Sequence, residues 1–160
     1  EGEIGMIEVR GPNVFKGYWN MPDKTALELR ETGYFITGDL GKLSSDGYLS
    51  IVGREKDLII SGGYNVYPKE VEDILKALNQ IDETAVFGIP DSDLGERVVA
   101  AIVLENNKNF NQSKTEVFVN EKLARYKQPK EYFVLDSLPR NSMGKVQKNE
   151  LRKRFSSSDI

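Results

Sequence analysis

An α+β fold is predicted for this chain of 160 residues, with a β-rich first third followed by a smaller domain in which helices flank a mixed sheet. Residues 1–52 read as short strands separated by glycine turns. From residue 68 onward, apolar residues recur at helical spacing, and two segments rich in β-branched residues follow at 84–89 and 98–104. Because strands and helices do not alternate strictly, we predict an α+β class, with a boundary that separates residues 1–54 from 55–160.

Turn residues delimit the elements of the first third. The expected strands are residues 6–9, 34–36, 41–43 and 48–52. Pro22 is expected to open a short helix, which Gly33 stops. The turn at residues 45–47 (SDG) predicts a hairpin between the apolar segments on either side of it.

The remaining chain is expected to contain both strands and helices. The expected strands are residues 58–60, 84–89, 98–104 and 132–135, and the expected helices begin at Pro68, at Ser113 and at Lys148. Ser113 and Glu116 form a capping-box pattern for a helix that runs to about residue 124. Residues 90–96 are expected to form a polar loop, and residues 156–158 a frayed tail.

Composition excludes several classes of function. A hydrophobic fraction of 39% and a charged fraction of 29% fit a modest core with a well-solvated surface. The net charge of −3 argues against binding nucleic acid or anionic membranes through bulk electrostatics. The chain has no cysteine and no histidine, which excludes disulfides, zinc–thiolate sites, histidine metal ligation and Ser-His-Asp catalysis within it. No apolar run approaches the roughly 20 residues that span a bilayer, so no membrane span is expected.

Three motifs in fixed order carry a family resemblance. They are residues 34–40 (YFITGDL), residues 53–72 (GREKDLIISGGYNVYPKEVE) and residues 139–148 (PRNSMGKVQK). Together they resemble the acyl-adenylate-forming enzymes, which include acyl-CoA synthetases, peptide-synthetase adenylation domains and luciferases. The resemblance implies that residues 1–54 are the tail of the large AMP-binding domain and that residues 55–160 are its small, mobile C-terminal lid.

The resemblance also implies a reaction in two half-steps. A substrate carboxylate attacks the α-phosphate of ATP, releases pyrophosphate and leaves an acyl-adenylate, and a thiol, usually that of CoA, then attacks the activated carbonyl. The implied cofactors are ATP, Mg²⁺ and CoA, and the implied partners are a small carboxylic acid and the large N-terminal domain of the same polypeptide. The family's phosphate-binding loop is absent, so we expect the chain to be a piece of a longer protein with no complete active site.

Lys145 is the predicted catalytic residue. A lysine in a turn is usually a solvated surface residue, but this one matches the family's C-terminal catalytic lysine within residues 139–148. By that match it would bridge the substrate carboxylate and the phosphate during adenylation, where a compact cation on a long stem is suited to the charge that builds up.

Two further residues match the family's nucleotide contacts. Asp39 matches the aspartate that accepts hydrogen bonds from both ribose hydroxyls, and Arg54 matches the arginine that reaches the ribose or phosphate region. The alternatives are a turn aspartate before a hairpin and a surface salt bridge. Lys56 matches the hinge position, whose backbone torsions change as the small domain rotates, and the alternative there is an exposed lysine at a strand end.

The segment Ser61-Gly62-Gly63-Tyr64 follows the expected hinge strand. By resemblance this loop faces the active site in the thioester-forming conformation and lets the pantetheine arm of CoA pass, because glycines allow a close approach of the backbone. The alternative is a plain β-turn between a strand and a helix.

Within the superfamily, residues 60–70 and 141–149 are most similar to malonyl-CoA synthetases, in the branch that also contains 4-coumarate- and fatty-acyl-CoA ligases. An acid–thiol ligase of fatty acid metabolism is therefore expected, in the cytoplasm by default. Two alternatives stay open. One is a peptide-synthetase-type adenylation domain that loads a carrier protein, and the other is a non-catalytic interaction module with the lid fold.

Overall fold

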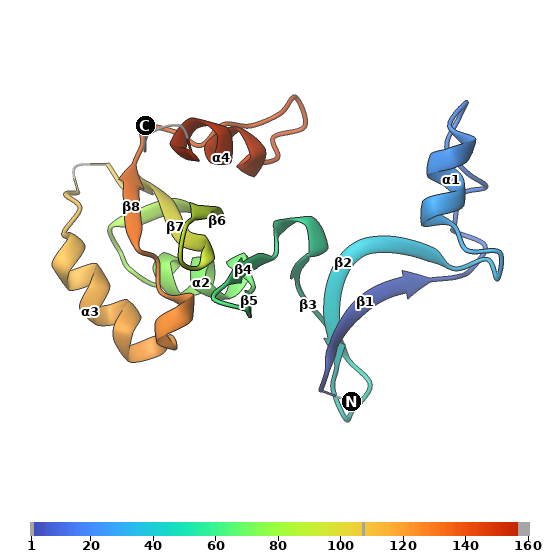
Figure 1. Ribbon diagram of the computed structural model, residues 1–160, viewed down its shortest axis with the longest axis horizontal. Coiled ribbons are helices and arrows are strands. Elements are labelled where there is room, and N and C mark those ends of the chain that lie inside the picture. The colour runs from blue at the N-terminus through green and yellow to red at the C-terminus, as the bar shows by residue number, and fades with distance from the viewer. Residues whose placement is uncertain (1, 107, 157–160) are drawn as a thin grey trace. The chain divides into compact units, whose positions relative to one another are not determined.

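The computed structural model describes residues 2–106 and 108–156. The chain divides into a first unit, residues 1–56, and a second unit, residues 57–160. Figure 1 shows the elements of both units. The assignment of these parts to the tail of a large domain and to a mobile lid stays a prediction. None of the helices in the described ranges is long and apolar enough to cross a membrane.

The first unit is a three-stranded antiparallel sheet with one short helix. Its elements are β1 (Ile4–Val9), α1 (Pro22–Glu28), β2 (Phe35–Leu43) and β3 (Leu49–Arg54), with sheet order β1-β2-β3. The helix at Pro22 and the hairpin around residues 45–47 are confirmed. The two strands expected at 34–36 and 41–43 are one continuous strand, because β2 pairs along its length with β1 on one side and with β3 on the other.

The second unit is built on a five-stranded mixed sheet. Its strands are β4 (Ile59–Ser61), β5 (Tyr64–Val66), β6 (Ile81–Asp91), β7 (Gly95–Leu104) and β8 (Glu131–Val134). Its helices are α2 (Pro68–Lys76), α3 (Gln112–Lys122) and α4 (Lys148–Ser156), with 3-10 turns η1 (Glu55–Asp57), which spans the unit boundary, and η2 (Arg125–Lys127). The order is β5-β4-β7-β6, and β8 pairs with β7 in parallel.

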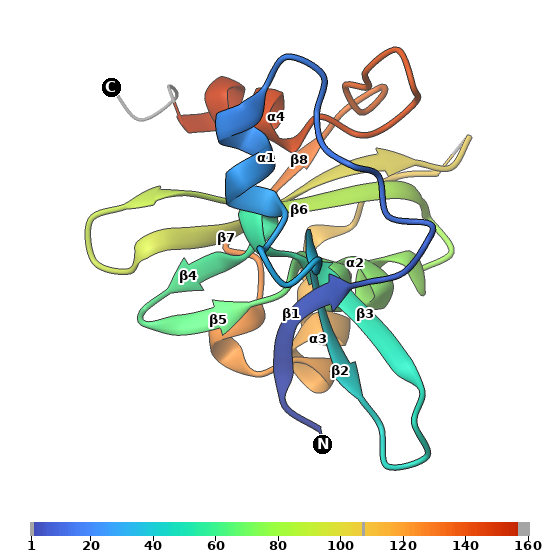
Figure 2. The ribbon, with the colours of Figure 1, turned by 90° about the vertical axis from the view of Figure 1, so that its right-hand side faces the viewer.

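Helices cover both faces of this sheet. Figure 2 shows α4 on one side of β6 and β7, and α2 and α3 on the other. One core cluster joins α2 and α3 to alternate residues of β6 and β7, for example Val71, Val119 and Val86. The other cluster joins Leu151 of α4 to the intervening residues, for example Phe87. The mixed sheet with flanking helices confirms the predicted α+β class.

Two local expectations were wrong. The polar loop expected at residues 90–96 is mostly strand, because Asp91 pairs with Gly95 and its carboxylate accepts hydrogen bonds from the N–H groups of Asp93 and Leu94 at 3.0 and 2.9 Å. These bonds close a tight turn and lower the pKa of Asp91. Helix α3 is capped by Asn111, whose side chain accepts from the Lys114 N–H at 3.0 Å, so Ser113 lies inside the helix. The expected tail at 157–158 lies outside the described residues.

Candidate functional site

Asp39 and Arg54 are brought together in the first unit. They lie opposite each other on the paired strands β2 and β3, and Arg54 Nε lies 3.0 Å from Asp39 Oδ1. The hydroxyl of Thr37 accepts the Asp39 N–H at 3.1 Å and donates to the Ile7 carbonyl at 2.9 Å, which holds this part of β2 against β1. A carboxylate and a guanidinium are thus fixed side by side on a partly exposed surface, although their role toward a nucleotide stays a prediction.

An open cavity of about 550 Å³ lies beside this pair within the first unit. Its lining includes Arg54 and Lys56 at the end of the unit, and Lys24 and Glu28 of α1. The Tyr18 hydroxyl in its wall donates to Glu28 Oε2 at 2.5 Å, and this hydrogen bond raises the pKa of the tyrosine. The lining carries three cations, Lys24, Arg54 and Lys56, against two carboxylates, Glu28 and Glu55, which leaves a small excess of positive charge.

Lys56 lies in the 3-10 turn η1, one residue before the boundary between the two units. It is exposed, and the two residues beside it, Glu55 and Asp57, complete the turn. Asp57 belongs to the second unit, where its carboxylate lies 3.7 Å from Arg152 of α4. A short turn at the point where two compact units meet is a suitable place for a hinge, and the hinge role of Lys56 stays a prediction.

Residues 61–64 form a tight turn between the short strands β4 and β5. Gly62 and Gly63 both have positive φ, 57° and 80°, which a two-residue hairpin turn requires and which glycine adopts without strain. Ser61 is buried and pairs with Gly95, while the Tyr64 ring stacks on Tyr126 with centroids 4.8 Å apart. The segment is therefore the turn of a hairpin, and the strand β5 separates it from α2. The simpler expectation was a β-turn that leads directly from a strand into a helix.

Lys145 lies in a loop that is closed on itself. Arg140 and Val146 form an isolated antiparallel bridge, and the Asn141 side chain accepts the N–H groups of Met143 and Lys145 at 3.0 and 2.9 Å. The Asn141 N–H in turn donates to the Lys145 carbonyl at 2.9 Å. Gly144 has φ of 77°, which lets the chain reverse within so few residues. This ordered backbone presents the exposed Lys145 side chain outward.

Arg140 and Asn141 were not singled out from the sequence, although both shape this loop. Arg140 donates to the Gly144 carbonyl at 2.6 Å and forms an ion pair with Glu83 of β6. The only sequence signal was an asparagine four residues before the lysine, since asparagine side chains often accept hydrogen bonds from the backbone N–H groups that follow.

The hairpin at residues 61–64 and the loop at residues 140–146 lie at opposite ends of the paired strands β6 and β7. Ser61 pairs with Gly95 near the turn of these strands, whereas Arg140 binds Glu83 near the start of β6. The second unit thus carries two separate candidate surfaces. Within the described residues, no group of three or more His, Cys, Asp or Glu side chains is arranged to hold a metal ion.

Comparison with known proteins gives the family. Residues 70–145 match the family described as AMP-binding enzyme C-terminal domain. The chain carries an AMP-binding enzyme C-terminal domain. The long-chain-fatty-acid–CoA ligase of Bacillus subtilis (strain 168) is 44% identical over 149 residues, which cover 93% of this chain and 26% of that protein.

Solved structures agree with this assignment. ATP-bound MatB from Rhodopseudomonas palustris is 51% identical, with a TM-score of 0.91 over 98% of this chain and 31% of its own. The apo form of the same protein gives a TM-score of 0.72. The o-succinylbenzoate CoA synthetase MenE of Bacillus subtilis, in complex with its acyl-adenylate intermediate OSB-AMP, is 41% identical with a TM-score of 0.89, over 94% of this chain and 30% of its own.

This chain spans 26% to 31% of the length of these relatives. The resemblance to acyl-adenylate-forming enzymes, and within them to the acyl-CoA ligases, is confirmed by these homologues. The segment matched by the family ends at Lys145, the residue predicted to be catalytic.

Proposed function

We propose that this chain is the C-terminal part of an ATP-dependent acyl-CoA ligase. The enzyme would form an acyl-adenylate from a carboxylic acid and ATP, and then an acyl-CoA thioester. The observation that carries the proposal is the Lys145 loop, which is held by the Asn141 side chain, lies within the AMP-binding C-terminal segment and offers an exposed cation.

In the first half-reaction, Lys145 would meet the two anions that must approach each other. The carboxylate oxygen attacks the α-phosphorus, the bond to pyrophosphate breaks, and negative charge accumulates on the oxygens between donor and acceptor. A fixed ammonium group at that point stabilises the charge more in the transition state than in the ground state, because the loop needs no reorganisation when the charge develops.

Asp39 and Arg54 would bind the nucleotide of the same step. The Asp39 carboxylate has two oxygens, of which Oδ1 meets Arg54 at 3.0 Å. A carboxylate has capacity for several hydrogen bonds, so it can accept ribose hydroxyls as well as the guanidinium. The cations Arg54, Lys24 and Lys56 around the adjacent cavity suit a phosphate-bearing ligand. No step of this scheme is assigned to Mg²⁺.

In the second half-reaction, the hairpin at residues 61–64 would replace the Lys145 loop at the reacting carbonyl. The thiol of CoA loses its proton, the sulfur attacks the carbonyl, and AMP leaves. The Gly62-Gly63 turn has no side chains, so an extended arm can pass close to its backbone. Because this hairpin and the Lys145 loop lie at opposite ends of β6 and β7, one fixed arrangement would not serve both steps, and a rotation about Lys56 would exchange them.

Two observations support a hinge and a larger parent protein. The ATP-bound and apo forms of MatB match this chain with TM-scores of 0.91 and 0.72 at the same 51% identity, so this region of one relative occurs in two shapes. In addition, the first unit leaves large apolar side chains exposed, among them Trp19 and Leu27 at 90% and 76%. A remaining large domain would cover such a surface.

The two competing functions, a carrier-protein-loading domain and an interaction module, differ from the ligase in whether an adenylate forms and in which thiol accepts the acyl group. A carrier-protein-loading domain would transfer the acyl group to a phosphopantetheinylated carrier instead of CoA, and an interaction module would form no adenylate. The ligase is favoured because the homologues are CoA ligases and the Lys145 loop is intact. Malonate is the first acid to test, given the similarity of residues 60–70 and 141–149 to malonyl-CoA synthetases.

The test uses the full-length protein with Lys145→Ala. Adenylate formation is expected to fall by about 10²–10³-fold, as for the loss of one charge-stabilising donor, while thioester formation from supplied acyl-adenylate and CoA falls much less. Pyrophosphate exchange measures the first step, and thioester release measures the second. Lys122→Ala, at an exposed lysine in the last turn of α3, is the matched control. Equal loss of both half-reactions in Lys145→Ala would contradict the assigned role.

A further inference from the structure

Lys148 makes an ion pair in which both side chains are largely shielded from water. It is the first residue of α4, its Nζ lies 2.7 Å from Glu72 Oε1, and the two side chains are only 16% and 15% exposed. The same oxygen of Glu72 accepts the N–H of Val86 at 2.9 Å. A carboxylate this shielded from water is costly to leave unpaired, so both partners are needed to satisfy it.

The pair joins opposite faces of the sheet around its edge. Strand β6 is the last strand in the sheet order, α2 packs on one of its faces, and α4 packs on the other. The Glu72 carboxylate of α2 accepts the N–H of Val86 on this edge strand. The same carboxylate pairs with Lys148, which begins α4 on the other face. The ion pair therefore fixes the start of α4 to the far layer of the domain.

The start of α4 is also the end of the Lys145 loop. Lys148 follows Lys145 by three residues, and between them Val146 packs against the core cluster that contains Leu151. The loop has one further charged anchor, Arg140 with Glu83, at its beginning. Both ends of the loop are thus attached to β6 or to a side chain bound to it, one through Arg140 and the other through Lys148.

We propose that Lys148 is a positioning residue for Lys145, and that its ion pair with Glu72 around the edge of β6 sets where the Lys145 ammonium lies during adenylation. This inference rests on the proposed ligase function. Lys148 itself touches no reacting atom in this scheme. Removing the pair leaves the hydrophobic core in place, but it frees the start of α4 to shift and loosens the loop that precedes it.

The test measures both half-reactions of the full-length ligase with Lys148→Met, which keeps most of the side-chain length and removes the charge. Because a displacement of about 1 Å can cost up to about 100-fold, kcat for adenylation is expected to fall between about 10- and 100-fold. KM for ATP and for the acid should stay within about twofold, since binding of the ground state does not use the Lys148 pair. Thioester formation from supplied acyl-adenylate is expected to change by less than about twofold, because the hairpin at residues 61–64 is untouched.

Three further variants make the result specific. Lys148→Arg retains a cation and should restore most of the lost adenylation rate. Glu72→Gln keeps an oxygen for the Val86 N–H while it removes the charge, and it should reproduce the defect of Lys148→Met. Lys69→Met removes the lysine of an exposed ion pair with Asp73 on the same helix α2 and should leave both half-reactions unchanged.

Amide exchange separates displacement of the loop from unfolding. In Lys148→Met the amides of Gly144 and Lys145 should exchange faster while that of the buried Val99 does not. Faster exchange at all three, equal loss of both half-reactions, or an unchanged adenylation rate would each overturn the positioning role. If the wild-type protein forms no acyl-adenylate from any acid, the proposed function fails and this inference fails with it. Wild-type activity that Lys148→Met and Glu72→Gln retain in full overturns this inference alone.

Discussion

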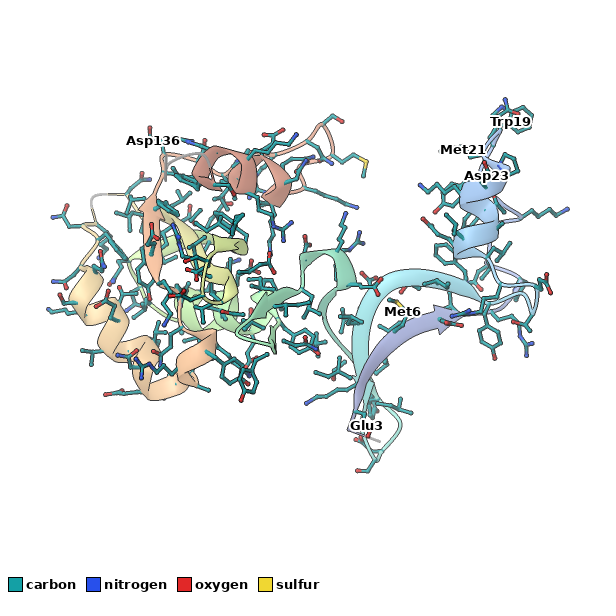
Figure 3. All side chains as sticks on the ribbon, viewed as in Figure 1. Glu3, Met6, Trp19, Met21, Asp23 and Asp136 are labelled. Carbon is teal, nitrogen blue, oxygen red and sulfur yellow. The ribbon has the colours of Figure 1, made fainter. Side chains whose placement is uncertain are left out.

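The two units differ in where their apolar side chains lie. Every buried hydrophobic residue of the described chain belongs to the second unit, from Ile59 to Leu151. In residues 2–56 the large apolar side chains are half-buried or exposed, and Trp19 and Met21, which lie beside the start of α1, are 90% and 50% exposed (Figure 3). The sheet of the first unit has three strands and one short helix, whereas the sheet of the second has helices on both faces.

The contrast shows that regular strand pairing does not by itself make a unit stable. A sheet needs an apolar layer against at least one face to be stable by itself, and the second unit provides such a layer on both faces. The first unit has well-formed strand pairing and a specific Asp39–Arg54 contact, but no interior. Hydrogen-bonded strands alone do not offset the conformational entropy that folding removes.

The largest expected effect is on independent folding. Residues 57–160 produced alone should unfold cooperatively, with a free energy of unfolding of about 5–15 kcal/mol, because their core is complete. Residues 1–56 produced alone should show no cooperative transition. Circular dichroism during urea titration and calorimetry measure both. A cooperative transition of monomeric 1–56 would remove the contrast.

A smaller effect is expected inside the second unit. Phe87 is fully buried between the sheet and α4, near Phe155, so Phe87→Ala should lower the free energy of unfolding by about 3–5 kcal/mol. Val117 lies on α3 with 59% of its surface exposed, and Val117→Ala should change the free energy of unfolding by less than about 0.5 kcal/mol. Urea unfolding of residues 57–160 tests both variants. Similar losses in the two would mean that the core is not where the structure places it.

The smallest effect is a dependence on alkaline pH. Burial raises the pKa of Tyr132, which packs beside Phe110, from 10.0 to about 12. A raised pKa means that the folded state holds the phenolic proton more tightly than the unfolded state. The corresponding stability is therefore complete below pH 10 and is lost as the pH rises from 10 toward 12.

Tyr132→Phe has no phenolic proton, so its stability should decline less over that pH interval. The urea midpoint of residues 57–160 at pH 8, 10 and 11, for both proteins, measures the difference. Equal declines would show that Tyr132 is not the group responsible.

Local patterns predicted much of this molecule. Proline at the start of α1 and α2 and the apolar spacing of Val71 and Leu75 are properties of neighbouring residues, and they predicted these helices. The same holds for the hairpin around residues 45–47. Sequence failed where two local signals competed. Asn111 and Ser113 are both good caps, and in the structure it is Asn111 that caps α3.

The candidate site divides in the same way. The motif residues Asp39, Arg54 and Lys145 could be selected from the sequence because they match a family pattern. The ion pairs at the two ends of the Lys145 loop come from distant positions: Arg140 binds Glu83, and Lys148 binds Glu72. Such pairs are set by how α2, β6 and α4 stack. In a single sequence, nothing distinguishes these charged residues from others on a solvated helix face.

By itself, the amino-acid sequence determined the class of fold and the positions of most elements, and it selected the lysine that is predicted to be catalytic, because these depend on residues within a few positions of one another. Tertiary structure decided that only the second unit encloses a core, and that the hairpin at residues 61–64 and the Lys145 loop lie at opposite ends of β6 and β7. It also decided that Glu72 and Lys148 meet around a sheet edge. These properties depend on contacts between segments far apart in the chain, which form only when the sheet and its helices pack together.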